Sequence, residues 1–202
     1  MLDFFQKGGP IMWPLLLTSV VALAVVIERM IFILRELESR NPGLVGQILS
    51  HTENGDPARA IETGKSSEDF VARTLVYGLL HRHKSFSNAL LQAANRELER
   101  FGRGLPVLDT IVTLAPLLGL LGTVSGLIRS FGLLGAQELD APTAITGGIA
   151  EALIATAFGL TIAIVALIPL NYLNARVEEA RREIEDASTH LELLLMEPAR
   201  RE

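Results

Sequence analysis

The sequence predicts an all-α membrane protein with three transmembrane helices and a helical cytoplasmic domain, in which spans two and three extend into the cytoplasm. Three observations lead to this fold class: three long windows without charge, a high apolar content and an uneven distribution of Lys and Arg. Of the 202 residues, 49% are hydrophobic and 20% are charged, and the mean hydropathy is +0.36. Together with the 17 glycines, this apolar share exceeds that of typical soluble domains.

The charge-free windows are long enough to cross a bilayer. They cover Gly8–Ile27, Thr110–Ile128 and Ala152–Ala175, which are 20, 19 and 24 residues long. At a rise of ~1.5 Å per residue, about 20 helical residues cross the ~30 Å hydrocarbon core. Pro10 and Pro14 fall in the opening turns of the first window, where a missing amide proton costs least. We therefore expect each window to form one transmembrane helix.

Lys and Arg are concentrated in two of the segments outside the windows. Residues 28–104 hold eleven of the 18, the tail from Arg176 onward holds five, and residues 132–150 hold none. The positive-inside rule therefore places 28–104 and the tail in the cytoplasm and the N-terminus on the other side. Because the chain starts with Asp3 against a single Lys7, we expect the first window to be a retained anchor and not a cleaved signal peptide.

These features predict the order of segments along the chain. The C-terminal segment carries Val177, Ile184 and Leu191 at near-helical spacing, which indicates that the third span continues as a long helix. The expected segments are an outer N-terminus at 1–7, transmembrane helix 1 at 8–28, a cytoplasmic helical domain at 29–104, transmembrane helix 2 at 105–130, an outer loop at 131–145, transmembrane helix 3 at 146–173, and a cytoplasmic C-terminal helix and tail at 174–202.

Small residues recur at steps of three and four in the second and third spans. These helix-packing candidates are Gly119, Gly122 and Gly126 in span two and Ala152, Ala155 and Gly159 in span three. Stripes of small residues let helix backbones approach closely in a membrane, where lipid supplies no hydrophobic drive for association. The first span has no comparable stripe. We therefore expect spans two and three to pack as a pair.

Glu151, at the opening of the third span, is the residue most in need of an explanation. An ionisable group well inside a bilayer costs ~3 kcal/mol or more, so it normally faces protein or water. Glu151 either lies near the headgroups or pairs with Arg129 at the same end of span two, or it belongs to a polar lumen that conducts an ion. Thr123 and Ser125 in span two, with Thr156 and Thr161 in span three, are candidates to continue such a lumen, although threonines in membrane helices often bond their own backbone.

The residues needed for other chemistry are missing or misplaced. The chain has no Cys, and its four His all fall in predicted cytoplasmic segments, so no base is available to a nucleophile in the membrane. Residues 63–66, TGKS, are similar to the end of a phosphate-binding loop, but Arg59 stands where its first glycine is required. A net charge of -5 and 5% aromatic residues argue against a nucleic-acid partner. We expect no enzyme activity, no catalytic residue, no metal and no cofactor.

Two motifs resemble those of the ExbB/TolQ/MotA proton-channel family. Leu114–Val124, LAPLLGLLGTV, is similar to the family's second-span motif, and Gly148–Leu160, GIAEALIATAFGL, is similar to its third-span motif. The predicted topology and the helical tail extend the resemblance over nearly the whole chain. Three spans instead of four favour the ExbB/TolQ branch over the flagellar stator branch, with ExbB as the nearer relative and TolQ as the alternative.

The resemblance implies a homopentamer in the bacterial inner membrane, with its N-terminus in the periplasm and spans two and three lining a central pore. The pore holds the single helices of an ExbD-like or TolR-like partner, whose intramembrane aspartate takes up and releases protons. Proton flow then drives a TonB-like or TolA-like protein across the periplasm. By motif position, Thr123 and Thr156 are implied to line the pore, Glu151 to be the pore glutamate, and Pro116 to shape span two.

The chain departs from the family pattern at three positions. Ser125 stands where many relatives have Trp, Arg129 follows one turn later, and the third-span proline is displaced to Pro169. Three functions stay open on the sequence alone: a motor subunit for outer-membrane uptake, a TolQ-like subunit for envelope maintenance, and a passive oligomeric scaffold. The coupling ion is expected to be the proton, with sodium as the alternative.

Overall fold

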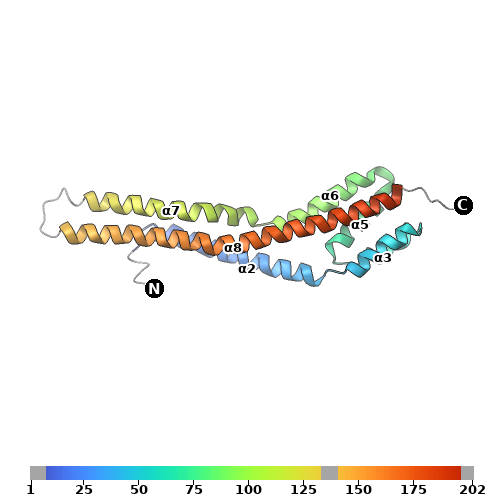
Figure 1. Ribbon diagram of the computed structural model, residues 1–202, viewed down its shortest axis with the longest axis horizontal. Coiled ribbons are helices and arrows are strands. Elements are labelled where there is room, and N and C mark those ends of the chain that lie inside the picture. Colours follow the sequence, from blue (N-terminus) through green and yellow to red (C-terminus); the bar gives the residue numbers. More distant parts are fainter. Residues whose placement is uncertain (1–7, 133–140, 197–202) are drawn as a thin grey trace. The chain divides into compact units, whose positions relative to one another are not determined.

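The computed structural model describes residues 8–132 and 141–196, without the side chains of 83, 84 and 141–145, and the regular structure in these residues is entirely α-helical (Figure 1). The helices are α2 (Met12–Glu38), α3 (Pro42–Glu53), α4 (Pro57–Gly64), α5 (Phe70–Leu80), α6 (Arg82–Gly102), α7 (Leu105–Gly132) and α8 (Ala141–Met196). Three helical stretches of this described part are long and apolar enough to span a membrane: Met12–Glu38, Ser85–Gly132 and Thr146–Met196. The predicted all-α class with three spans is confirmed. The predicted segment 1–7, most of the loop 131–145 and the tail after Met196 lie outside the described residues.

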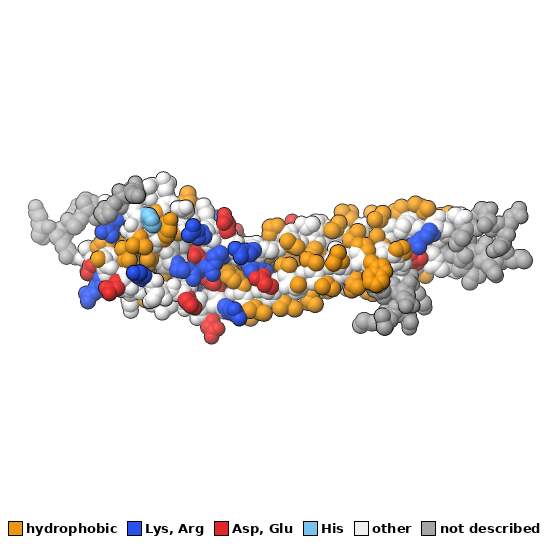
Figure 2. All heavy atoms as spheres, turned by 180° about the vertical axis from the view of Figure 1, so that it is seen from behind, with side chains coloured by type: hydrophobic (Ala, Val, Ile, Leu, Met, Phe, Trp, Pro, Cys, Tyr) orange, Lys and Arg blue, Asp and Glu red, His pale blue; other side chains and the backbone are white. Residues whose placement is uncertain are grey.

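The chain divides into two compact units. Unit 1 comprises residues 1–29 and 104–172, and unit 2 comprises residues 30–103 and 173–202. α2 and α8 each contribute residues to both units, since the divisions fall inside these two helices. Figure 2 shows charged side chains gathered over the helices of unit 2 and hydrophobic side chains over those of unit 1.

α6 and α7 are separated at Gly104, which has a positive φ of 80°. This left-handed conformation costs a glycine little, whereas other residues rarely adopt it. Pro106 follows at the second residue of α7, where its missing amide proton interrupts no helical bond. The change from α6 to α7 therefore takes only two residues, Arg103 and Gly104.

In unit 1, α7 and α8 approach each other along their small residues. A Cβ atom added at Gly119 would lie 3.0 Å from the Thr156 Cα, and one at Gly159 would lie 2.5 Å from the Ala115 carbonyl oxygen. A Cβ at Gly126 would lie 3.0 Å from the Ala152 Cβ. At Gly119 and Gly159 the neighbours are backbone atoms, so no side-chain rotation relieves the contact. We call this contact, formed by the following residues, the α7–α8 seam: Ala115, Gly119, Gly122, Gly126 and Ser130 of α7, and Gly148, Ala152, Ala155, Thr156, Gly159 and Ala163 of α8.

α2 packs one face against the seam and leaves the other exposed. Met12 and Leu15 are each 1% exposed and form a buried cluster with Ala115. The opposite face exposes large apolar side chains, which include Trp13, Leu17, Val20, Leu23 and Ile27. A helix that is hydrophobic all round is typical of a membrane span, so this outer face is suited to lipid.

In unit 2, one buried carboxylate joins the beginnings of two helices. Asp69 is wholly buried and accepts hydrogen bonds from the α5 amides of Val71, at 2.8 Å, and Ala72, at 3.2 Å, which makes it the N-cap of that helix. It also accepts the Asn41 amide at 2.6 Å, just before α3, and pairs with Arg40. Arg40 in turn donates from Nε to the Glu183 Oε2 of α8 at 2.7 Å. Buried charges are stable when they are paired and hydrogen-bonded in this way.

A second charged network joins α2, α5 and α6. Arg73 of α5 donates to Glu36 of α2 and to Glu97 of α6, each at 2.8 Å, and Arg100 donates to Glu97 at 2.6 Å. Burial would lower the pKa of Arg73, but the hydrogen bonds and charges of Glu97 and Glu36 outweigh burial and raise that pKa. The partly exposed guanidinium therefore stays charged beside the two carboxylates.

Substitution of Gly159 by Ala tests the seam. The added methyl group collides with the Ala115 carbonyl oxygen, so we expect a loss of about 1–3 kcal/mol of stability, typical of overpacking. Gly147→Ala is the matched control, because a Cβ there meets nothing within 4 Å. Thermal unfolding in a mild detergent, followed by circular dichroism, gives both midpoints. Equal midpoints for the two variants would contradict the seam.

Two N-cap aspartates test the network at Asp69. Asp69→Ala removes the acceptor of three amides and one of the two carboxylates that pair with Arg40, so we expect it to cost about 3 kcal/mol, typical of breaking a buried pair. Asp56→Ala removes an exposed cap that accepts only the Arg59 amide, at 3.0 Å, and should cost about 1 kcal/mol. The same melting experiment compares them, and a smaller effect at Asp69 than at Asp56 would refute the network's role.

Candidate functional site

Thr156 forms a hydrogen bond across the seam. Its hydroxyl, on α8, donates to the Gly119 carbonyl oxygen of α7 at 3.0 Å. Two features of the sequence allow this contact: Gly119 has no side chain, and the adjacent Ala155 is small. A carbonyl oxygen has two lone pairs, so the Gly119 oxygen can also accept the helical bond from the amide four residues on, which is that of Thr123. The Gly119 carbonyl oxygen can therefore accept from both the Thr156 hydroxyl and the Thr123 amide.

The hydroxyl groups of Thr123 and Thr161 bond inside their own helices. Thr123 donates to the Leu120 carbonyl at 2.6 Å, and Thr161 donates to the Ala157 carbonyl at 2.8 Å. This is the common behaviour of threonine in a membrane helix. The structure thus distinguishes Thr156, which bonds between helices, from the other two threonines.

Glu151 forms an ion pair with Arg129. The carboxylate Oε1 accepts a hydrogen bond from Nη2 of Arg129, which lies in the last turn of α7. The Glu151 side chain is 22% exposed and that of Arg129 49%. Of the interpretations open on the sequence, the ion pair is thus present in the structure. Arg129 also approaches the Ser125 carbonyl oxygen, one turn earlier, with its Nε at 3.5 Å.

The turn before α2 lies against this ion pair. Gly9 has a positive φ of 71°, and a Cβ added there would overlap the Glu151 carboxylate and lie 3.2 Å from Nη2 of Arg129. The sequence analysis missed this contact. The run Gly8-Gly9-Pro10 is a turn signal, but nothing in it indicates that the turn lies beside a residue in the third span.

Two prolines interrupt the hydrogen bonding of the long helices without ending them. Pro116 lies inside α7 and Pro169 inside α8. Proline has no amide proton, so the carbonyl groups four residues earlier, those of Val112 and Val165, lose their helical donors. Pro116 is next to Ala115 of the seam. The displaced proline of span three is therefore a real interior proline of α8.

Acidic residues are scarce in the apolar helices. Among the described residues of unit 1, α2 contributes Glu28, which pairs with its neighbour Arg29, while α7 contributes Asp109 and α8 contributes Glu151. Asp109 lies near the start of α7, and Arg129, which pairs with Glu151, lies near its end. At ~1.5 Å per residue, the ~20 residues between Asp109 and Arg129 correspond to about 30 Å of helix. The carboxylates of Asp109 and Glu151 are therefore too far apart to exchange a proton directly.

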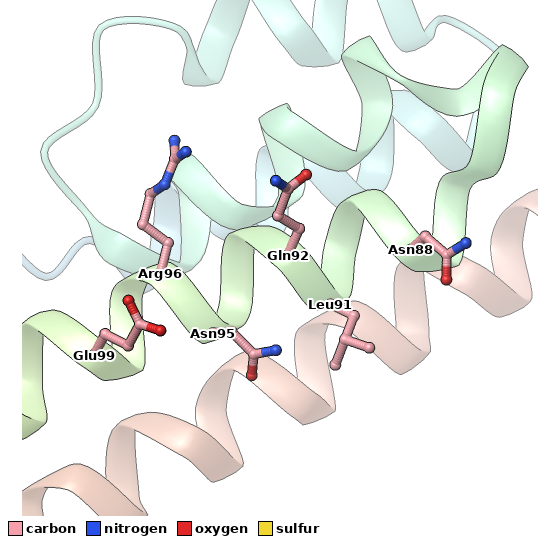
Figure 3. Close-up of a pocket in the computed structure, with 6 residues that line it drawn as sticks. All are labelled: Asn88, Leu91, Gln92, Asn95, Arg96 and Glu99. Carbon is pink, nitrogen blue, oxygen red and sulfur yellow. The ribbon is translucent and has the colours of Figure 1, made fainter.

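Hollows in unit 2 include one on α6 and one of about 20 Å³ beside Glu36, Arg40 and Glu183. No group of three or more His, Asp or Glu in the described residues could hold a metal ion. The open hollow on α6, of about 420 Å³, is lined by that helix alone, through Asn88, Leu91, Gln92, Asn95, Arg96 and Glu99. Figure 3 shows Arg96 and Gln92 pointing away from Asn95 and Leu91. The polar groups of a ligand site converge on one point. The side chains around this hollow do not (Figure 3), so the hollow is an irregularity of the α6 surface.

Comparisons with known proteins find similar sequences over most of the chain. The family model described as the MotA/TolQ/ExbB proton channel family matches residues 65–186, which include Thr123, Glu151 and Thr156. An ExbB-like biopolymer transport protein of Synechocystis sp., ExbB-like 1, is 38% identical over 98% of this chain and 80% of its own length. The biopolymer transport protein exbB1 of Vibrio cholerae is 28% identical over 94% of this chain and 86% of its own length.

A second group of relatives matches a shorter part of the chain. The Tol-Pal system protein TolQ of Pseudomonas aeruginosa is 45% identical, over 46% of this chain and 40% of its own length. The family model covers more than half of the chain, and the Synechocystis relative covers nearly all of it. The chain therefore belongs to the MotA/TolQ/ExbB proton channel family.

Proposed function

We propose that this chain is the channel subunit of an inner-membrane motor that couples proton flow to mechanical work. In this proposal it acts with an ExbD-like partner and drives a TonB-like protein that serves uptake through the outer membrane. The observation that carries the proposal is the Thr156–Gly119 hydrogen bond, at 3.0 Å, inside the segment that matches the proton channel family. A hydroxyl at a closely packed pair of helices is suited to orienting a proton-carrying group beside it.

The need for a partner follows from the distribution of acids. Asp109 and Glu151 lie toward opposite ends of the apolar helices of unit 1, and Glu151 is paired with Arg129. Proton transfer across ~30 Å of hydrocarbon requires further titratable groups or water. An aspartate on the single helix of a partner would supply such a group. The proposal therefore places the site of proton exchange on the partner, with Thr123, Glu151 and Thr156 lining its path.

The proposed assembly is a homo-oligomer, with five copies expected from the family resemblance. α7 exposes the apolar side chains of Leu117, Leu121, Val124 and Ile128 on one face, at steps of four, three and four. In a membrane such a face suits lipid or the helices of further copies. The Lys and Arg distribution favours an N-terminus in the periplasm and a C-terminus in the cytoplasm.

A TolQ-like role is the second candidate, and one observation favours it. The local identity to the Pseudomonas aeruginosa TolQ, 45%, exceeds the 38% identity to the Synechocystis relative, although the match covers less of the chain. In that case the partners would be TolR-like and TolA-like, and the work would maintain the cell envelope. Mass spectrometry of proteins that co-purify from gently solubilised native membranes separates the two, because the third component differs.

Thr156 provides the direct test. Thr156→Val keeps the size of the side chain but removes the donor to Gly119, so we expect proton-dependent work in the native host to fall about tenfold or more, the equivalent of one lost hydrogen bond of ~1.4 kcal/mol. Thr156→Ser should retain the work. Thr161→Val is the matched control, since that hydroxyl bonds only its own helix at Ala157.

The outcomes are measured as iron-complex uptake and detergent resistance in complemented deletion cells, with recovery of the complex as the measure of assembly. Normal work by an assembled Thr156→Val variant would contradict the role of Thr156. Glu151→Gln tests the passive scaffold: an unchanged phenotype for this variant would favour the scaffold over the motor.

A further inference from the structure

We propose that Arg129 is a positioning residue, which holds the Glu151 carboxylate in an ion pair closed by the turn at Gly8 and Gly9. Glu151 then takes part in ion transfer only when this pair opens. The inference rests on the proposed function, because it assigns a control to the pore glutamate of that channel. It concerns three parts of unit 1: the turn before α2, the last turn of α7 and the part of α8 around Glu151, about three turns after Ala141.

The first argument is the geometry of the pair. Arg129 Nη2 donates to Glu151 Oε1, and the Arg129 Nε lies 3.5 Å from the Ser125 carbonyl oxygen of its own helix. Arg129 thus contacts its own helix, α7, through Nε and binds Glu151 of α8 through Nη2. A cation in the last turn of a helix is also favoured by the partial negative charge at that end.

The second argument is the fixed spacing of the helices beside the pair. Ser130, the neighbour of Arg129, is 1% exposed and donates to the Gly126 carbonyl at 2.9 Å. A Cβ added at Gly148, three residues before Glu151, would overlap the Ser130 hydroxyl. Close packing at Gly126, Ser130 and Gly148 therefore sets the distance between the α7 and α8 backbones beside the ion pair. The Arg129 side chain is long enough to span that distance.

The third argument is the turn beside the Glu151 carboxylate, which contains two glycines, Gly8 and Gly9. Gly9 has a left-handed backbone, with a φ of 71°, and any side chain at this position would displace the Glu151 carboxylate. Gly8 packs as closely, since a Cβ there would lie 2.5 Å from the Met12 sulfur. The turn therefore packs against one side of the carboxylate with backbone alone, and a side chain at position 9 would compete with the ion pair for that space.

The fourth argument is electrostatic. A lone charge at membrane depth is unfavourable, whereas an ion pair is neutral as a whole. Removing one member leaves the other without its compensating charge, and the Glu151 side chain is only 22% exposed. Arg129 thus accounts for the presence of a charged Glu151 at the end of an apolar helix, and it also restricts the carboxylate to one partner until something separates them.

The experiment compares Arg129 variants in the native host, with the partner proteins present. Arg129→Gln should leave the complex assembled, increase the resting proton leak several-fold and decrease the coupled work. Arg129→Lys should restore both toward the original values. In the exchange Arg129→Glu/Glu151→Arg, the ion pair is kept but the carboxylate moves to α7, so we expect assembly without work. A purely structural ion pair would be rescued by the exchange, and that result would overturn the inference.

Two glycine variants test the Arg129–Glu151 ion pair without altering its charges. Gly9→Ala should push the Glu151 carboxylate away from Arg129 and raise the leak. Gly55→Ala is the control, because Gly55 has a similar φ of 74° in unit 2 but meets nothing within 4 Å. An unchanged leak in Gly9→Ala, or equal leaks in the two glycine variants, would refute the proposed closure.

The failure of this inference is distinguishable from that of the proposed function. If Arg129→Gln and Gly9→Ala behave as the original chain while Glu151→Gln and Thr156→Val lose work, the channel function stands and the control by Arg129 is wrong. If Glu151→Gln and Thr156→Val also retain full work, the channel function itself is wrong.

Discussion

The glycines of the α7–α8 seam determine how closely these two helices of unit 1 pack. At Gly119 and Gly159 the facing atoms are backbone, so α7 and α8 lie closer than any larger residue permits. This proximity lets the hydroxyl of Thr156 reach a carbonyl oxygen on the other helix, at 3.0 Å, and it brings Arg129 within reach of Glu151. Small residues replace the hydrophobic effect as the basis of association in a membrane. The polar contacts of the site therefore depend on the close helix spacing that the glycines allow.

The two units satisfy their charges in different ways. In unit 2 the charged groups form networks, in which Asp69 has three amide donors as well as Arg40, and Arg73 binds two carboxylates. In the apolar helices of unit 1 the pairing is sparser, and Arg129 with Glu151 is the pair that joins two of them in the described part. The segment that matches the proton channel family includes both members of this pair.

Much of the fold follows from local patterns in the sequence. The charge-free windows predict the three spans, and the spacing of Val177, Ile184 and Leu191 predicts the long continuation of α8, because both signals depend on residues close together in the chain. The ion pair of Glu151 was one of three open interpretations, since the sequence gives the residues at one end of two helices but not the rotation of the helices. The contact of Gly9 with that pair, and the Asp69 and Arg73 networks, were not predicted. Each joins side chains or turns that are distant in sequence, and such pairings have no periodic signature. The pore roles of Thr123, Glu151 and Thr156 stay predictions.

The division into two units has a consequence for how the molecule loses its structure. Urea solvates apolar and peptide groups in water, so it acts on unit 2, whose core includes Ile48, Leu75 and Leu79 and whose charged networks need an aqueous boundary. The seam of unit 1 gains nothing from the release of water, and its competitor is a detergent molecule that can insert between the helices. Denaturant therefore acts on the core of unit 2 and detergent on the seam of unit 1, while α2 and α8 continue through both units.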